Sequence, residues 1–165
     1  VRRLQIYGIS NAAVLVVNNA TREVEAYLGS PDYADKAASG EVDGVRAVRS
    51  PGSALKPLAY TLAMDKGLIT PKTVLTDVPT NFDGYTPENF DRTYRGFVPA
   101  EKALINSLNI QAVKLVRSLG VAAFTEALTN AGFEQIRKDG KKLGLSVVLG
   151  GSDPVAAIIM RVESS

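Results

Sequence analysis

The sequence has 165 residues, of which 45% are hydrophobic and 22% are charged, and its formal net charge is +2. This length suffices for one domain with its own core, and so small a charge gives no reason to expect a nucleic-acid partner. The absence of Cys and His excludes disulfides, thiolate nucleophiles, histidine-bound zinc and the Ser-His-Asp triad, which leaves Lys, Glu, Asp or Tyr as the possible general bases.

Residues 12–19 and 23–30 predict a β-hairpin. The first segment, AAVLVVNN, is a β-branched run that ends in two Asn, and the second, EVEAYLGS, alternates apolar and polar residues. Two such runs around a short polar turn are typical of paired antiparallel strands. Because the first run is apolar on both faces, we expect it to be a central strand covered on both sides, with the second strand nearer an edge.

A helix is predicted after the polar loop of residues 31–48. Leu55, Leu58 and Leu62 recur at helical spacing behind the turn-forming Ser-Pro-Gly of residues 50–52, and the pattern ends at Gly67. Pro57 lies about one turn into this pattern. We expect it to remove a hydrogen bond there and to distort the first turn.

Residues 70–99 are rich in Pro, Gly, Asn and Asp and predict a long irregular segment with one short strand. Three helices are predicted after it, over residues 99–107, 109–120 and 121–132. The apolar segment 143–152 has no clear period, and residues 154–163 fit either a helix or a strand. A hairpin followed mainly by helices leaves the first strand without further partners, so we expect the sheet to be incomplete.

Ser53 and Lys56 are candidates for a nucleophile and its base. Residues three apart on a helix share one face, so the two side chains could touch. The positive end of the helix and burial would both lower the pKa of the lysine, and a neutral amine could then take the serine proton. The alternative is a helix cap or first-turn residue at Ser53 and a solvated surface lysine, since a lone Ser-x-x-Lys arises about once by chance in a chain this long.

The stretch NSLN, residues 106–109, places a second pair of polar side chains where one predicted helix ends and the next begins. A loop between two helices can aim the Ser107 hydroxyl and the Asn109 amide into a cleft. Asn109 is equally well suited to be a simple N-cap of the second helix.

Ser-x-x-Lys followed by Ser-x-Asn resembles the signature of the penicillin-recognising serine acyltransferases. The resemblance extends over about residues 12–151 to the transpeptidase domain of class A high-molecular-weight penicillin-binding proteins, with the 1C subgroup the most similar. It is carried by AVLVVNNATREVEAYLGS, RSPGSALKPLAYTLAMDKGLITP, GYTPENFDRTYRG, KALINSLNIQAVKLVRSLG and LGLSVVLGG. It implies an α+β penicillin-binding and serine β-lactamase-like fold.

The resemblance also implies a reaction and a role for each candidate residue. Ser53 would be the acylated nucleophile, Lys56 its general base, Ser107 the proton relay and Asn109 the contact to the substrate amide. The expected reaction is D,D-transpeptidation, in which attack on a D-Ala-D-Ala bond of a peptidoglycan stem peptide releases D-alanine and an amine resolves the acyl-enzyme. β-Lactams would trap the serine, and neither a metal nor an organic cofactor is implied.

The third motif of the family, Lys-Thr/Ser-Gly, does not occur in this sequence. We therefore expect residues 1–165 to be part of a transpeptidase domain, without the later strands and without a glycosyltransferase domain, and weakly active or inactive alone. The start VRRLQIYGIS likewise suggests a piece of a longer chain. The resemblance implies an extracytoplasmic protein at the periplasmic face of the inner membrane. Since no apolar run approaches the roughly 18 residues of a membrane span, we expect the anchoring segment to lie elsewhere in the parent.

Three alternatives remain beside the transpeptidase. A D,D-carboxypeptidase differs only in its acceptor, and a non-catalytic module would bind β-lactams or peptidoglycan without turnover. A class A β-lactamase is disfavoured because EALTN at residues 126–130 has the wrong order for a deacylating Glu-x-x-Leu-Asn loop, and Leu108 stands between Ser107 and Asn109.

Overall fold

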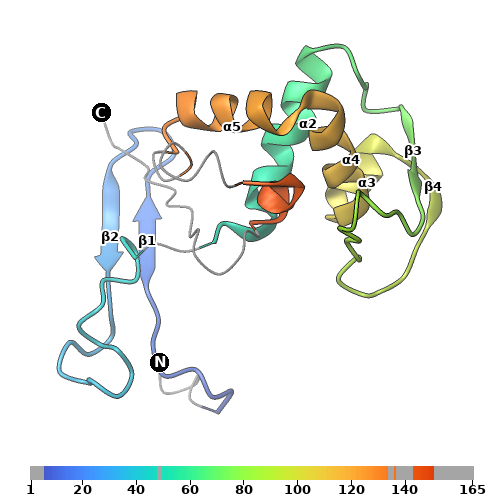
Figure 1. The fold of residues 1–165 in the computed structure, drawn as a ribbon. Coiled ribbons are helices and arrows are strands. Elements are labelled where there is room, and N and C mark those ends of the chain that lie inside the picture. Colours follow the sequence, from blue (N-terminus) through green and yellow to red (C-terminus); the bar gives the residue numbers. More distant parts are fainter. Residues whose placement is uncertain (1–5, 48–49, 134–135, 137–142, 151–165) are drawn as a thin grey trace. The chain divides into compact units, whose positions relative to one another are not determined.

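The computed structural model describes residues 6–47, 50–133, 136 and 143–150. They form two compact units, one within residues 6–47 and the other within residues 50–150. Figure 1 traces both units in chain order. None of the helices in the described residues is long and apolar enough to cross a bilayer.

The first unit contains the predicted hairpin. Strands β1 (Val14–Val17) and β2 (Val24–Leu28) pair antiparallel, with Val14 opposite Leu28 and a register irregularity after Val16. The turn closes because the Asn18 Oδ1 atom accepts hydrogen bonds from the backbone N–H groups of Ala20 and Thr21 at 2.9 and 3.1 Å. An Asn side chain is well suited to this local turn bonding.

The expectation that the first strand is covered on both faces is wrong for the described residues. Val14, Leu15 and Val16 are all exposed, and β1 pairs there with β2 alone. Residues that alternate along a strand point to opposite faces, so apolar side chains are open on both sides of the hairpin. This pattern fits the predicted α+β fold with an incomplete sheet.

The second unit is mainly helical. A 3-10 turn, η1 (Gly52–Leu55), leads into α2 (Lys56–Asp65), and α3 (Ala100–Ile105), α4 (Asn109–Leu119) and α5 (Val121–Asn130) follow. These elements confirm the helices predicted from the apolar periodicity. Their core holds these buried residues: Leu55, Ala59, Ala63, Val113, Val116, Phe124, Leu128 and Val147. The core fixes α2, which begins at Lys56, against α4, which begins at Asn109.

The turn before Pro57 is a 3-10 turn and not an α-helical one, in line with the expected distortion of the first turn. The chain first forms the 3-10 turn, and the α-helix begins only at Lys56, so Pro57 occupies the first turn of α2. Because η1 runs directly into α2, an N–H at residue 57 would face the Ser53 and Ala54 carbonyls, so Pro57 removes one hydrogen bond as expected.

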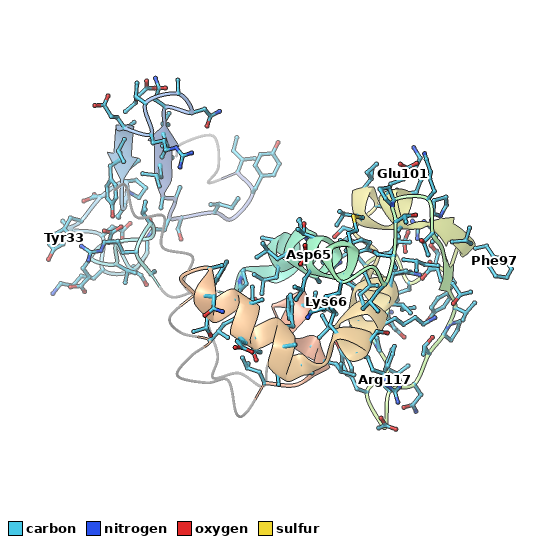
Figure 2. All side chains as sticks on the ribbon, turned by 90° about the horizontal axis from the view of Figure 1, so that it is seen from above. Tyr33, Asp65, Lys66, Phe97, Glu101 and Arg117 are labelled. Atoms are coloured by element: carbon cyan, nitrogen blue, oxygen red, sulfur yellow. The ribbon has the colours of Figure 1, made fainter. Side chains whose placement is uncertain are left out.

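The segment 70–99 holds two strands rather than one. Strands β3 (Val74–Asp77) and β4 (Gly96–Pro99) pair antiparallel, with Leu75 opposite Val98. Only four residues long, with Gly first and Pro last, β4 lacks a recognisable strand pattern. Its inward side chain, Val98, is buried, whereas Phe97 is 81% exposed and projects away from the unit (Figure 2).

The apolar segment 143–152 contains a second 3-10 helix, η3 (Leu145–Leu149), with Val147 and Val148 buried. Residues 154–163, for which either a helix or a strand was predicted, lie outside the described residues. The segment η3 packs against η1 and α4. Just after η3, the Gly150 carbonyl accepts a hydrogen bond from the hydroxyl of Ser50, which lies three residues before Ser53.

Gly150 should be intolerant of any side chain. It has φ of 71°, and a Cβ there would overlap the backbone of Gly52 and the Ser50 side chain. We expect Gly150→Ala to lower the free energy of unfolding by about 2–4 kcal/mol, from the strained backbone and the overlap together. Gly132→Ala is the matched control, because Gly132 has φ of 91° with open space around it, so its cost should be about 1 kcal/mol. Equal losses in a denaturant titration would contradict the packing argument.

Candidate active site

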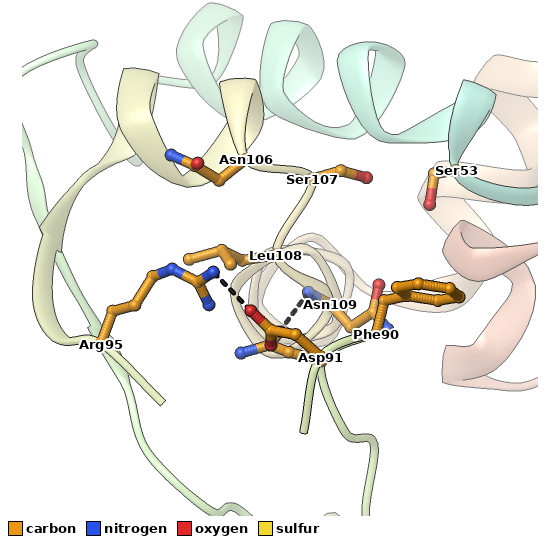
Figure 3. A pocket seen from close by; sticks show the side chains of 9 residues that line it. Ser53, Phe90, Asp91, Arg95, Asn106, Ser107, Leu108 and Asn109 are labelled. Carbon is orange, nitrogen blue, oxygen red and sulfur yellow. Dashed lines mark hydrogen bonds and ion pairs between the residues drawn. The ribbon is translucent and has the colours of Figure 1, made fainter. Parts of the chain in front are cut away.

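Ser53 lies in η1 and lines a cavity of about 420 Å³. The other lining residues come from two loops: Asn89, Phe90, Asp91, Arg95, Asn106, Ser107, Leu108 and Asn109 (Figure 3). Ser53 is not a helix cap, because the caps of η1 and α2 are Pro51 and Leu55 and neither helix has a side-chain cap, but it is a first-turn residue of η1, as the alternative interpretation allowed. The Ser53 hydroxyl is exposed at the cavity and forms no hydrogen bond within the described residues.

Lys56 is the most unusual residue of the site. Its side chain is 1% exposed, so the interpretation as a solvated surface lysine is wrong. Its Nζ atom donates to the Ser107 carbonyl at 2.6 Å, to Ser107 Oγ at 3.0 Å and to Asn109 Oδ1 at 2.6 Å. In the described part of the chain no carboxylate lies within ion-pair distance of this amine.

Burial without a countercharge lowers the pKa of Lys56 to about 8. Desolvation penalises the ammonium, and the three acceptors are neutral dipoles that replace water only in part. At pH 7 roughly one lysine in ten would carry no proton, which is far more than for a lysine in water. The site therefore holds an amine that can act as a base near neutral pH.

The structure differs from the sequence-based expectation in what Lys56 touches. Among the described residues, Ser53 and Lys56 are joined only through the backbone, where the N–H of Lys56 donates to the Ser53 carbonyl, and no hydrogen bond joins their side chains. A charged amine has three donors, and the loop at residues 107–109 takes all three. Ser53 meets this loop across the cavity that both line.

The backbone explains how Ser107 reaches the lysine. After α3, the N–H of Ser107 donates to the Leu104 carbonyl and the N–H of Leu108 donates to the Ala103 carbonyl, both at 2.9 Å. This pair of bonds is a Schellman motif, whose reversing residue has a left-handed conformation and is usually glycine. Here that residue is Ser107, with φ of 51°. A strained non-glycine residue of this kind is typical of functional sites.

Asn109 is not the N-cap of α4. It is the first helical residue, Leu108 precedes it as the cap, and no side chain of the cap bonds to the helix. The Asn109 side chain instead accepts from Lys56 and donates through Nδ2 to the Glu88 carbonyl at 2.6 Å. The backbone N–H of Asn109 donates to Asn89 Oδ1 at 2.9 Å.

The opposite wall of the cavity comes from residues to which sequence reasoning gave no role. Phe90 is fully exposed beside the cavity, and Arg95 Nη2 pairs with Asp91 Oδ2 at 2.6 Å (Figure 3). The Arg95 hydrogen bond lowers the pKa of Asp91 to about 2. All three lie in GYTPENFDRTYRG, which carried part of the family resemblance, but their spacing alone does not indicate a shared cavity.

No group of three or more Asp or Glu side chains in the described residues is arranged to hold a metal ion. The chemistry available to the described site is that of a hydroxyl nucleophile, a buried amine, a second hydroxyl and an amide. This set is suited to nucleophilic acyl transfer with lysine as the base.

Comparison with known proteins gives the same family as the motifs. Residues 12–148 match the family model described as penicillin binding protein transpeptidase domain. Over 143 residues the chain is 40% identical to penicillin-binding protein 1C of Escherichia coli, covering 87% of this chain and 19% of that protein. It is 35% identical to penicillin-binding protein 1F of Bacillus subtilis, over 86% of this chain and 19% of that protein. The chain thus spans about a fifth of the length of these relatives.

Solved structures share the fold. Penicillin-binding protein 1A of Haemophilus influenzae aligns with 92% of this chain and 22% of its own, at a TM-score of 0.71 and 26% identity. The penicillin-binding protein PonA1 of Mycobacterium tuberculosis aligns with 90% of this chain and 41% of its own, at a TM-score of 0.70 and 23% identity. The fold is therefore the penicillin-binding transpeptidase fold, and the chain belongs to the family of penicillin-binding protein transpeptidase domains.

Proposed function

We propose that this chain forms part of a serine D,D-transpeptidase that cross-links peptidoglycan stem peptides through an acyl-enzyme at Ser53. The observation that carries the proposal is the contact of the buried Lys56 amine with Ser107 and Asn109, on the cavity that Ser53 lines. A buried lysine with no carboxylate partner is expensive to maintain. A depressed lysine pKa is the property that a serine acyltransferase without histidine requires.

In the proposed acylation, neutral Lys56 accepts the Ser53 proton while Ser53 Oγ attacks the carbonyl carbon between the two D-alanines. The backbone N–H of Ser53 is one donor to the oxyanion. Ser107 passes a proton to the leaving amine, because its Oγ is already hydrogen-bonded to Lys56. The C–N bond breaks, D-alanine leaves, and an ester to Ser53 remains. An amine from a neighbouring strand then attacks the ester and restores the serine.

Asn109 is proposed to hold the substrate amide. An amide side chain has two donor hydrogens and two acceptor lone pairs. Lys56 and the Glu88 carbonyl use one of each, so one hydrogen and one lone pair remain for a peptide backbone. The same contact to Lys56 ties the substrate-binding group to the base.

The proposed partners are stem peptides, β-lactams and the remainder of the parent polypeptide, which would supply the Lys-Thr/Ser-Gly strand and a membrane anchor. One solved structure with this fold is PonA1 in complex with penicillin V, and β-lactam binding by this chain is proposed from family membership. Residues 1–165 are accordingly proposed as one partial domain, extracytoplasmic, with no metal or organic cofactor in its chemistry.

Replacement of Ser53 tests the proposal directly. In the complete polypeptide that carries this chain, we expect fluorescent penicillin to label the protein covalently and Ser53→Ala to abolish the label without changing its thermal unfolding. Retained labelling in Ser53→Ala would contradict the assignment. Release of D-alanine with cross-linked product distinguishes the transpeptidase from the carboxypeptidase, and a stable adduct without D-alanine release indicates the non-catalytic module.

The pKa of Lys56 predicts the pH dependence of acylation. Only the neutral amine can take a proton, so the labelling rate should rise as the pH passes through about 8 and level off above it. The increase from pH 7 to pH 9 should be about tenfold, as the neutral fraction approaches one. A labelling rate that stays flat between pH 6.5 and 9.5 would exclude Lys56 as the base.

Ser107 offers a test that separates chemistry from stability. Ser107→Ala keeps the left-handed backbone strain and loses the hydroxyl, whereas Ser107→Gly loses the hydroxyl and relieves the strain. We expect the Gly variant to be about 1 kcal/mol more stable than the Ala variant. Both should label about 10²-fold or more slowly than the wild type, which is the usual cost of a lost proton-transfer group. Faster labelling by the more stable Gly variant would indicate a structural role only.

A further inference from the structure

A chain of buried polar side chains connects β3 to the candidate base. It begins at Asp77, the last residue of β3, which is 0% exposed. It continues through Asn89, which is 3% exposed, to the backbone of Asn109 and from the Asn109 side chain to Lys56. Neither Asp77 nor Asn89 belongs to the Ser-x-x-Lys or Ser-x-Asn stretch.

Asn89 caps α4 from a position twenty residues away. The residue before the helix is Leu108, which has no polar side chain to offer. Asn89 Oδ1 takes this place by accepting the N–H of Asn109 at 2.9 Å. The Asn109 side chain is consequently not needed as a cap. It is left to accept from Lys56 and to donate to Glu88.

Asp77 determines which end of the Asn89 amide faces the helix. A carboxylate can only accept hydrogen bonds, and Asn89 Nδ2 lies 3.0 Å from each Asp77 oxygen and 2.9 Å from the Thr93 carbonyl. All three neighbours require the NH₂ end of the amide, so the oxygen end must point to Asn109. Asp77 itself is held by the N–H of Arg95, which donates to Oδ2 at 2.9 Å.

We propose that Asp77 and Asn89 are positioning residues for the acylation of Ser53, which hold the α4 N-terminus so that Asn109 Oδ1 meets the Lys56 amine. This inference rests on the proposed function. It assigns no direct contact with substrate to Asp77. Its effect on Lys56 passes through Asn89 and then Asn109.

The test uses isosteric variants of the complete polypeptide. Asn89→Asp turns an oxygen toward Asp77 and Thr93, and Asp77→Asn turns an NH₂ toward Asn89 or Arg95. Each should slow the covalent step with penicillin about 10–100-fold, as small misplacements of catalytic groups do. The dissociation constant of the initial non-covalent complex should change less than threefold. A slower covalent step with an unchanged dissociation constant indicates a positioning role. A general loss of fold would instead slow the covalent step and raise the dissociation constant together.

Matched controls and a reversed pair complete the design. Asn81→Asp and Asp83→Asn make the same chemical changes at exposed positions of the same loop, and both should acylate like the wild type. The double variant Asp77→Asn with Asn89→Asp restores a donor opposite an acceptor, so it should acylate faster than Asn89→Asp alone.

The possible failures are distinguishable. If the wild type forms no adduct at Ser53, the proposed function is wrong. If the wild type labels and Asp77→Asn and Asn89→Asp, shown to be folded by circular dichroism, label at the same rate, the positioning role is wrong. If Asn89→Asp does not fold, the labelling rate of Asp77→Asn alone decides whether the positioning role is right. A double variant no faster than Asn89→Asp would contradict the proposed pairing.

Discussion

The site depends on one constraint, which is the burial of a lysine amine whose hydrogen-bond partners in the described part of the chain are all neutral. Lys56 begins α2 inside the core of the helical unit, and its three donors meet Ser107 and Asn109. A carboxylate partner would stabilise the ammonium and keep its pKa high, whereas dipolar acceptors hold the amine in place without fixing its charge. The same contacts thus orient the group and leave it able to lose a proton.

Local backbone features serve this constraint. The 3-10 turn before α2 carries Ser53 and leads directly into the helix at Lys56. The Schellman motif after α3 reverses the chain at Ser107 and accepts the strain of a left-handed serine. Together these features bring the start of η1, the end of α3 and the start of α4 to a single cavity.

The family assignment and the local geometry support each other from independent directions. The family model covers residues 12–148, and the relatives are several times longer than this chain. The β1–β2 hairpin exposes apolar side chains in the described residues, and an isolated two-stranded hairpin is marginally stable in water.

The sequence by itself determined the hairpin, the main helices and the candidate residues Ser53, Lys56, Ser107 and Asn109, because apolar periodicity, Gly and Pro positions and short motifs are local signals. Only the tertiary structure decided the partners of these residues. It paired β4 with β3, placed Asn89 as the remote cap of α4, and directed Lys56 to the loop at 107–109 rather than to Ser53. These outcomes depend on contacts between residues 19 to 53 positions apart, and no local pattern encodes which buried donor will meet which acceptor.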